Sequence, residues 1–203
     1  VNRARRQRGE PAISSIWLWG AGKRPQIPSF REKFGLSGAV ISAVDLHKGL
    51  AIYAGLEPIN VPGATGWLDT NYAGKVEYAL KALHTKDFVF LHVEAPDEAG
   101  HQGDLRHKLT ALEDFDAKVV GPMLEGLHKR FAAFRVLLLP DHPTPLALKT
   151  HVREPVPIAL YGTDVEADAG QTFDESVREK GSIDIQNGTE LMPLLVQRAT
   201  VKA

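Results

Sequence analysis

The sequence predicts an α/β protein, a three-layer α/β/α sandwich built around a mostly parallel sheet. Short apolar, β-branched runs alternate along the chain with longer amphipathic stretches, which is the order of strands and helices in parallel sheets. The chain has 203 residues, of which 43% are hydrophobic, so it is long enough for one domain with a substantial core. Acidic and histidine residues follow or flank several of the apolar runs, where sheets of this kind collect their ligands.

The strands are expected where apolar residues form short runs between turn signals. The run at residues 87–93 is the clearest buried strand, because it is rich in Phe, Val and Leu. The complete set of expected strands is 39–44, 58–61, 87–93, 134–139 and 157–161.

The helices are expected where apolar residues recur every three or four positions. Asp45 is a suitable N-cap for the first of them, and Gly55 a suitable stop. Pro122 should kink or split the longest one, because proline lacks the amide hydrogen that a helix interior needs. The expected helices are 45–54, 71–84, 102–130 and 188–198, and the apolar face of the third consists of Leu105, Leu109, Leu112, Phe115, Val119, Met123 and Leu127.

Composition and charge exclude several classes of function. The net charge is −1, so no overall field attracts nucleic acid or an anionic membrane. The chain has no cysteine, which rules out disulfides and thiolate metal sites. No apolar run approaches the roughly 20 residues of a membrane helix, and no signal peptide is visible, so a cytoplasmic location is expected.

Three groups of acidic and histidine residues indicate a metal centre. Asp97 and His101 follow the strand at 87–93, and their i, i+4 spacing lets both side chains face one point. The alternative is that Asp97 caps the helix at 102 and His101 is an exposed residue of its first turn. Carboxylate and imidazole together suit zinc and manganese, so the pair is typical of a catalytic centre with two metal ions.

The second and third groups lie further along the chain. Asp141 and His142 follow the strand at 134–139, and binding one ion with both needs a turned backbone, which Pro143 and Pro145 could supply. The alternative is a polar loop. His151 lies before the next strand, and a lone histidine is more often exposed or structural. Since each group sits beside a different strand, a doubly wound sheet would bring all three together.

The remaining histidines are weaker candidates for metal ligands. His92 is expected to be a core histidine inside its strand. Several further runs extend the pattern of the three groups. These are PDEAGHQG at 96–103, DHPTP at 141–145, WLWGAG at 17–22, VPGATG at 61–66, DTNY at 69–72 and PVP at 155–157. Together they resemble the cofactor-independent phosphoglycerate mutases of the archaeal type, which belong to the alkaline phosphatase superfamily.

The resemblance implies an alkaline-phosphatase-like α/β/α fold and two divalent ions: manganese, magnesium or zinc. It implies that Asp97, His101 and His151 hold one ion, and that Asp141 and His142 hold the other. The family interconverts 3-phosphoglycerate and 2-phosphoglycerate in glycolysis through a phosphoserine intermediate. Two further roles follow from the resemblance alone: Lys48 as a catalytic, phosphate-binding lysine, and Arg5 and Arg6 as substrate-binding arginines. The alternatives are a surface lysine on a helix and a solvated basic tail.

The chain departs from the family in one respect. The nucleophilic serine and a further metal-binding aspartate belong to an N-terminal segment of the family, and no serine here matches: Ser14 and Ser15 precede the WLWG run, and Ser42 is expected inside a strand. The chain therefore resembles the C-terminal part of such an enzyme. Residues 1–12 would be a tail or a remnant of an inserted substrate-binding domain, and residues 13–203 the C-terminal part of the phosphatase-like domain.

Two other interpretations stay open. One is another phosphatase or phosphotransferase of the superfamily, such as a homoserine-kinase-like protein. The other is a non-catalytic remnant, or a subunit that acts with a partner chain. The expected partners are a phosphorylated small molecule and either a missing N-terminal segment or a second copy, because an incomplete sheet has an exposed edge.

Overall fold

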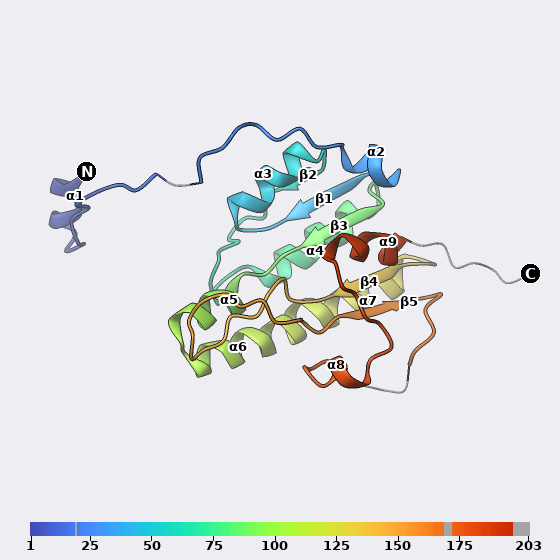
Figure 1. The fold of residues 1–203 in the computed structure, drawn as a ribbon. Helices are drawn as coiled ribbons and strands as arrows, with labels where there is room; N and C mark the ends of the chain where they lie inside the picture. The colour runs from blue at the N-terminus through green and yellow to red at the C-terminus, as the bar shows by residue number, and fades with distance from the viewer. Residues whose placement is uncertain (19, 169–171, 197–203) are drawn as a thin grey trace, which may run out of the picture.

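A parallel sheet of three strands forms the centre of the molecule. The computed structural model describes residues 1–18, 20–168 and 172–196 (Figure 1). Strands β1 (Gly38–Ile41), β2 (Glu57–Ile59) and β3 (Phe88–Leu91) lie in the order β2-β1-β3, all parallel. The helices α3 (Asp45–Tyr53) and α4 (Tyr72–Ala82) connect successive strands, as parallel pairing requires. The predicted α/β class with a parallel sheet is confirmed.

The two crossover helices cover opposite faces of this sheet (Figure 1). On one face, Ile41 packs with Ala79 of α4, and both side chains are fully buried. On the other face, the ring of Phe90 lies 5.8 Å from the ring of His47 on α3. Because successive side chains of a strand point to opposite faces, Val89 and Leu91 of β3 pack against the cluster of Ile41 and Ala79, whereas Phe90 faces α3. The result is a helix–sheet–helix sandwich.

A second, smaller sheet is antiparallel. It consists of β4 (Arg135–Leu138) and β5 (Ala159–Gly162), with Val136 opposite Tyr161. Both strands were expected from the sequence, but they form a separate antiparallel pair, and the mostly parallel sheet that was expected consists of β1, β2 and β3. The residues between them form a loop in place of a crossover helix, so the chain returns in the opposite direction.

The long helix expected at 102–130 is a series of four helical segments. The first, α5 (Ala95–Gln102), starts seven residues earlier than expected and ends at Gly103, whose φ of 71° is left-handed. Asp104 then caps α6 (Leu105–Phe115) by accepting a hydrogen bond from the amide of His107. The π-helix η1 (Asp116–Val120) leads into α7 (Gly121–Arg130), so Pro122 coincides with a change of helix type, which accommodates its missing donor.

The chain ends contain short helices. The basic segment expected as a tail forms α1 (Asn2–Gln7), which lies apart from the sheet in Figure 1. The remaining elements are α2 (Phe30–Phe34), α8 (Val177–Lys180), η2 (Gly188–Glu190) and α9 (Leu191–Val196). The last two match the helix expected at 188–198, of which residues 197 and 198 lie outside the described part. Within that part, no helix combines the length and the apolar character needed to cross a membrane.

The apolar face expected along residues 105–127 is buried only in its second half. Val119 and Leu127 pack with Tyr72, Val76 and Leu80 in the core. In contrast, the stripe of leucines on α6 is about half exposed or more: 60% at Leu105, 51% at Leu109 and 48% at Leu112. The prediction of one continuous buried face is therefore wrong, because α6 extends beyond the helices that cover η1 and α7.

This difference predicts unequal costs for two leucine substitutions. Leu127→Ala should lower the free energy of unfolding by about 2–5 kcal/mol, because it leaves a cavity in the core. Leu112→Ala should cost about 1 kcal/mol or less, since much of that side chain already contacts water. Urea denaturation of the two variants measures both values. Equal losses would mean that the α6 stripe is packed against another surface in solution.

Candidate metal centre

Two of the predicted ligands, Asp97 and His101, lie on one side of the short helix α5. It begins four residues after β3 ends, with Pro96 in its first turn, where the missing amide hydrogen is no loss. Asp97 in the first turn also benefits from the positive end of the helix dipole. His101 follows one turn later. The alternative that Asp97 merely caps a helix starting at 102 is wrong, because both residues lie inside α5.

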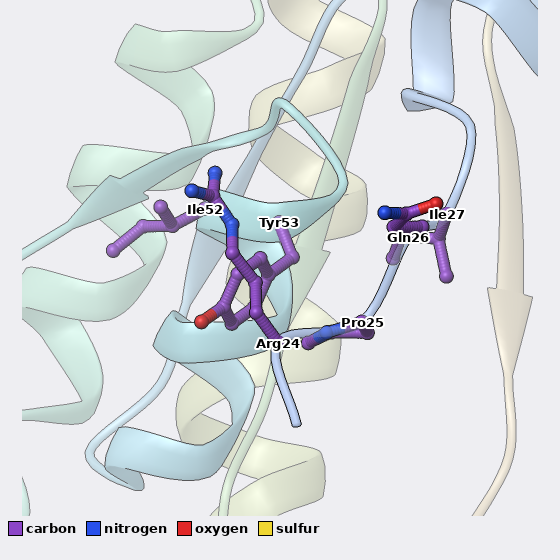
Figure 2. Close-up of a pocket in the computed structure, with 6 residues that line it drawn as sticks. All are labelled: Arg24, Pro25, Gln26, Ile27, Ile52 and Tyr53. Atoms are coloured by element: carbon purple, nitrogen blue, oxygen red, sulfur yellow. The ribbon is translucent and has the colours of Figure 1, made fainter. Parts of the chain in front are cut away.

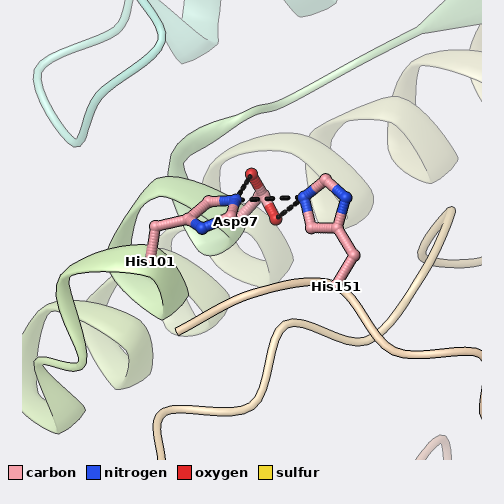
Figure 3. A group of neighbouring side chains, drawn as sticks. All are labelled: Asp97, His101 and His151. Atoms are coloured by element: carbon pink, nitrogen blue, oxygen red, sulfur yellow. Dashed lines mark hydrogen bonds and ion pairs between the residues drawn. The ribbon is translucent and has the colours of Figure 1, made fainter. Parts of the chain in front are cut away.

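Asp97, His101 and His151 converge on one point, although His151 comes from a loop 50 residues beyond His101 (Figure 3). The two Nε2 atoms of the histidines are 3.0 Å apart. His101 Nε2 lies 3.2 Å from Asp97 Oδ2, and His151 Nε2 lies 3.5 Å from Asp97 Oδ1. The two Nε2 atoms and both oxygens of the Asp97 carboxylate therefore lie together, and one ligand atom from each of the three residues lies within 4.8 Å of the others.

These separations fit a single divalent ion. Ligand atoms bonded at about 2.0–2.2 Å in a tetrahedral or octahedral shell lie about 2.8–3.6 Å from one another. The observed separations of 3.0, 3.2 and 3.5 Å fall in that range. Two imidazole nitrogens and a carboxylate are also a donor set that zinc and manganese accept. The geometry and the chemistry of the side chains thus agree on a metal site.

The backbone fixes the tautomer of His101. Its Nδ1 lies 3.0 Å from the carbonyl oxygen of Lys149, which can only accept a hydrogen bond. Nδ1 therefore carries the proton, and Nε2 presents its lone pair to the cluster. Lys149 has a φ of 54°, a left-handed conformation that is costly for any residue with a Cβ atom. Strain of this kind at a ligand-orienting carbonyl is typical of a functional site.

Asp141 and His142 form a second pair beside the first cluster. The backbone bends at both residues, as expected, and His142 Nε2 comes within 3.3 Å of Asp141 Oδ2. The imidazole ring of His142 lies 3.7 Å from that of His151, and its Nδ1 is 3.9 Å from Asp97 Oδ1. All five residues predicted to bind metal thus lie in one group, formed by α5 after β3 and by the loop between β4 and β5.

A polar network that was not predicted from the sequence lies close enough to the cluster for Asp97 and Asp141 to act on His92. Ser42 is buried just after β1, not inside the strand as expected, and its hydroxyl lies 3.0 Å from His47 Nδ1 and 3.2 Å from His92 Nδ1. His92 Nε2 is 3.4 Å from a carboxylate oxygen of Glu94. Burial, with a smaller contribution from His47, lowers the pKa of His92 to about 4, so this histidine is neutral. His92 therefore has polar partners, as expected, but it follows β3 and is only partly buried, so the expectation of a core histidine inside the strand is not fully met.

Burial also raises the pKa of Glu94, and the nearby carboxylates of Asp97, Glu98 and Asp141 add to this effect. The acidic groups are therefore close enough to repel one another, which a bound cation would relieve.

A fully buried lysine contacts the backbone of this network. Lys75 on α4 is 0% exposed, and its Nζ donates a hydrogen bond to the carbonyl oxygen of His92 at 2.9 Å. Burial lowers its pKa to about 8, against the opposing charge of Glu94. The sequence contained a signal for this lysine, because Lys75 shares a helical face with Tyr72 and Ala79, both of which are buried. Fully buried lysines are rare without a partner.

The structure does not bring the other predicted residues into the cluster. Lys48 lies on α3 and pairs with Asp45 at 3.2 Å. Arg5 pairs with Glu10 at 3.2 Å, and Arg5 and Arg6 both belong to α1, apart from the body of the molecule (Figure 1). Their roles stay predictions.

A surface hollow lies elsewhere, between α3 and the segment that precedes α2 (Figure 2). Its lining consists of Arg24, Pro25, Gln26, Ile27, Ile52 and Tyr53, with the Arg24 guanidinium 5.7 Å from the centre of the Tyr53 ring. It includes none of the cluster residues, and no group in it has the chemistry of a metal ligand set.

Comparison with known proteins agrees with the metal centre. The sequence model of the metalloenzyme superfamily matches residues 3–198. The chain belongs to the metalloenzyme superfamily. Its members are metal-dependent enzymes, so divalent metal binding follows from membership.

Similar proteins carry consistent names. A "probable 2,3-bisphosphoglycerate-independent phosphoglycerate mutase" of Geobacter sulfurreducens is 53% identical over 197 residues, which are 97% of this chain and 49% of the relative. A 2,3-bisphosphoglycerate-independent phosphoglycerate mutase of Methanosarcina acetivorans is 51% identical over 198 residues, or 97% of this chain and 50% of the relative. The chain thus spans about half the length of these curated relatives.

Two solved structures share the fold. The PH0037 protein from Pyrococcus horikoshii matches with a TM-score of 0.76 and 30% identity, over 83% of this chain and 50% of that one. The cofactor-independent phosphoglycerate mutase from Thermoplasma acidophilum matches with a TM-score of 0.65 and 27% identity, over 96% of this chain and 45% of that one. The predicted resemblance to cofactor-independent phosphoglycerate mutases is confirmed.

Gly100 is closely packed, so replacing it by alanine should have the opposite effect on stability to replacing a helical glycine whose Cβ position is open. A Cβ atom on Gly100 of α5 would lie 2.6 Å from the Thr144 carbonyl oxygen and 3.0 Å from Lys108 Nζ. Gly100→Ala should therefore displace the loop around Thr144, and reduce both stability and metal affinity. Gly49→Ala on α3 is the matched control: nothing lies within 4 Å of its Cβ position, so it should stabilise the protein by up to about 1 kcal/mol.

Urea denaturation measures the two stabilities, and equilibrium dialysis with Zn²⁺ measures the affinity. If Gly100→Ala stabilises the protein as Gly49→Ala does, and leaves the affinity unchanged, the close approach of the loop to α5 is absent in solution.

Proposed function

We propose that the chain is the C-terminal, metal-binding part of a cofactor-independent phosphoglycerate mutase, which interconverts 3-phosphoglycerate and 2-phosphoglycerate in glycolysis. The observation that carries this proposal is the convergence of Asp97, His101 and His151 on one point. The names of relatives at about 50% identity supply the reaction.

In this proposal, Asp97, His101 and His151 hold one divalent ion, and Asp141 and His142 hold a second. The ions are manganese, magnesium or zinc. When bound, such ions withdraw charge from phosphoryl oxygens and favour the ionised form of a nucleophilic hydroxyl. The Lys149 carbonyl keeps the Nδ1 proton on His101, so that its Nε2 stays available to a ligand.

The nucleophilic serine comes from a part of the enzyme beyond this chain. Ser42 is buried, and its hydroxyl contacts two histidines and the amide of Val44. A hydroxyl in that environment supports the surrounding fold and does not meet a substrate.

Further parts of the proposal concern the ends and surfaces of the chain. Residues 1–12 are a remnant of an inserted substrate-binding domain, and residues 13–203 belong to the phosphatase-like domain. Arg5, Arg6 and Lys48 contact the phosphorylated substrate when the enzyme is complete. The protein acts in the cytoplasm, on a small molecule and not on nucleic acid or a membrane, and it pairs with its missing N-terminal segment or with a second copy.

A chimeric enzyme tests this proposal directly. The chain replaces the corresponding half of the Geobacter sulfurreducens relative, and a coupled assay with Mn²⁺ measures the interconversion of phosphoglycerates. The chimera should be active, and the chain alone should show no turnover, because it lacks the nucleophile. His101→Ala should reduce the activity of the chimera at least about 100-fold, because it removes a metal ligand.

His84→Ala is the matched control, since His84 is exposed and lies outside the cluster; it should leave the activity unchanged. A folded, metal-binding chimera that cleaves phosphate esters but does not interconvert phosphoglycerates would favour a phosphatase. Equal activity of the two histidine variants would remove His101 from the mechanism.

A further inference from the structure

Thr144 is a buried polar residue in a loop where most neighbours contact water. It lies between Pro143 and Pro145, six residues after β4, and is 4% exposed. A buried hydroxyl costs stability unless it is hydrogen-bonded, so its partners indicate why it is there.

The Thr144 hydroxyl bridges the two groups of predicted metal ligands. It donates a short hydrogen bond to Asp97 Oδ1 of the first group. The same oxygen lies 3.3 Å from Nδ1 of His142 in the second group. A hydroxyl has one proton but can also accept, so a single side chain contacts both groups at once.

The direction of these two bonds fixes the tautomer of His142. The Asp97 carboxylate can only accept, so the Thr144 proton points to it, and the Thr144 lone pairs remain for His142 Nδ1. Nδ1 of His142 must then carry the hydrogen, and Nε2 is left with its lone pair. That lone pair faces Asp141 Oδ2 at 3.3 Å. Two such atoms repel each other unless a proton or a cation lies between them.

The position of the hydroxyl is set by contacts of the Thr144 backbone and methyl group. The Thr144 carbonyl accepts a hydrogen bond from Lys108 Nζ at 3.3 Å. Its carbonyl oxygen and methyl group pack so closely on Gly100 that a Cβ atom there would lie 2.6 and 2.9 Å from them. Helices α5 and α6 therefore hold Thr144 in place, and the hydroxyl has little freedom to turn away.

We infer that Thr144 is a positioning residue that couples the two metal-ligand groups, by orienting the Asp97 carboxylate and by setting the tautomer of His142. The inference rests on the proposed function for the identity of the site as a metal centre. In this inference, Thr144 binds no metal itself. It orients both groups of ligands through its hydroxyl. Partners of this kind typically change metal affinity 10- to about 100-fold when they are lost.

Two substitutions separate this role from simple packing. Thr144→Val keeps the shape and removes the hydroxyl, whereas Thr144→Ser keeps the hydroxyl and removes the methyl group. Equilibrium dialysis of the chain with Zn²⁺ should show a loss of affinity of about 10- to 100-fold in Thr144→Val. The affinity of Thr144→Ser should stay within a few-fold of the parent. Urea denaturation of both variants shows that they are folded at the start of the titration.

A second readout needs no metal. The ¹⁵N chemical shifts of His142 in the metal-free chain report which ring nitrogen carries the hydrogen. The parent and Thr144→Ser should show hydrogen on Nδ1, and Thr144→Val should lose that preference. The reverse pattern, with Thr144→Val like the parent and Thr144→Ser impaired, would overturn the inference and leave Thr144 as a packing residue.

The two proposals fail in different ways. If the parent chain binds no divalent ion, the metal centre is wrong, and the His142 tautomer alone then decides the role of Thr144. If the parent binds the ion and His101→Ala does not, but both Thr144 variants behave as the parent in both readouts, only the coupling role is wrong.

Discussion

The carboxylate of Asp97 is the group on which the arrangement of the site depends. One oxygen lies 3.2 Å from His101, and the other faces His151 and His142 and accepts the hydrogen bond of Thr144. These partners come from α5 and from the loop between β4 and β5, so the carboxylate connects the two sheets of the molecule at one edge. Both oxygens of a carboxylate can accept a hydrogen bond or bind a cation, whereas an amide has one such oxygen and an NH2 group that only donates, so its replacement by an amide would disturb the contacts of one of the two oxygens.

Concentrating negative charge in one place has consequences for the surrounding residues. After burial, Asp97 and Asp141 each raise the pKa of Glu94, and both also act on His92. Lys75 and Lys108 supply positive charge from α4 and α6, and burial lowers the pKa of both. Each lysine donates to a backbone carbonyl, of His92 and of Thr144 respectively, so the cations also hold the chain segments that contain or follow the ligand residues. A divalent ion would supply the remaining positive charge.

The features that the sequence predicted well are local ones. The i, i+4 spacing of Asp97 and His101 places both side chains on one side of α5 once that helix forms. The prolines after His142 predicted the turn at that residue. The break at Gly103 was not predicted, although a glycine followed by an N-cap aspartate is a local signal for a helix stop and a helix start. In contrast, the direction of β5 and the exposure of Leu112 depend on which elements meet in space. Thr144 has no ligand chemistry of its own, so only the fold reveals its two partners.

The central claim is that Asp97, His101 and His151 share one divalent ion. Crystals grown with Mn²⁺, with diffraction measured at the manganese absorption edge, test it most directly, because the anomalous signal locates the ion independently of the protein. The account predicts a peak about 2.0–2.2 Å from Nε2 of both histidines and from the Asp97 carboxylate. A peak elsewhere, with the two Nε2 atoms still 3.0 Å apart and joined by a hydrogen bond, would contradict it.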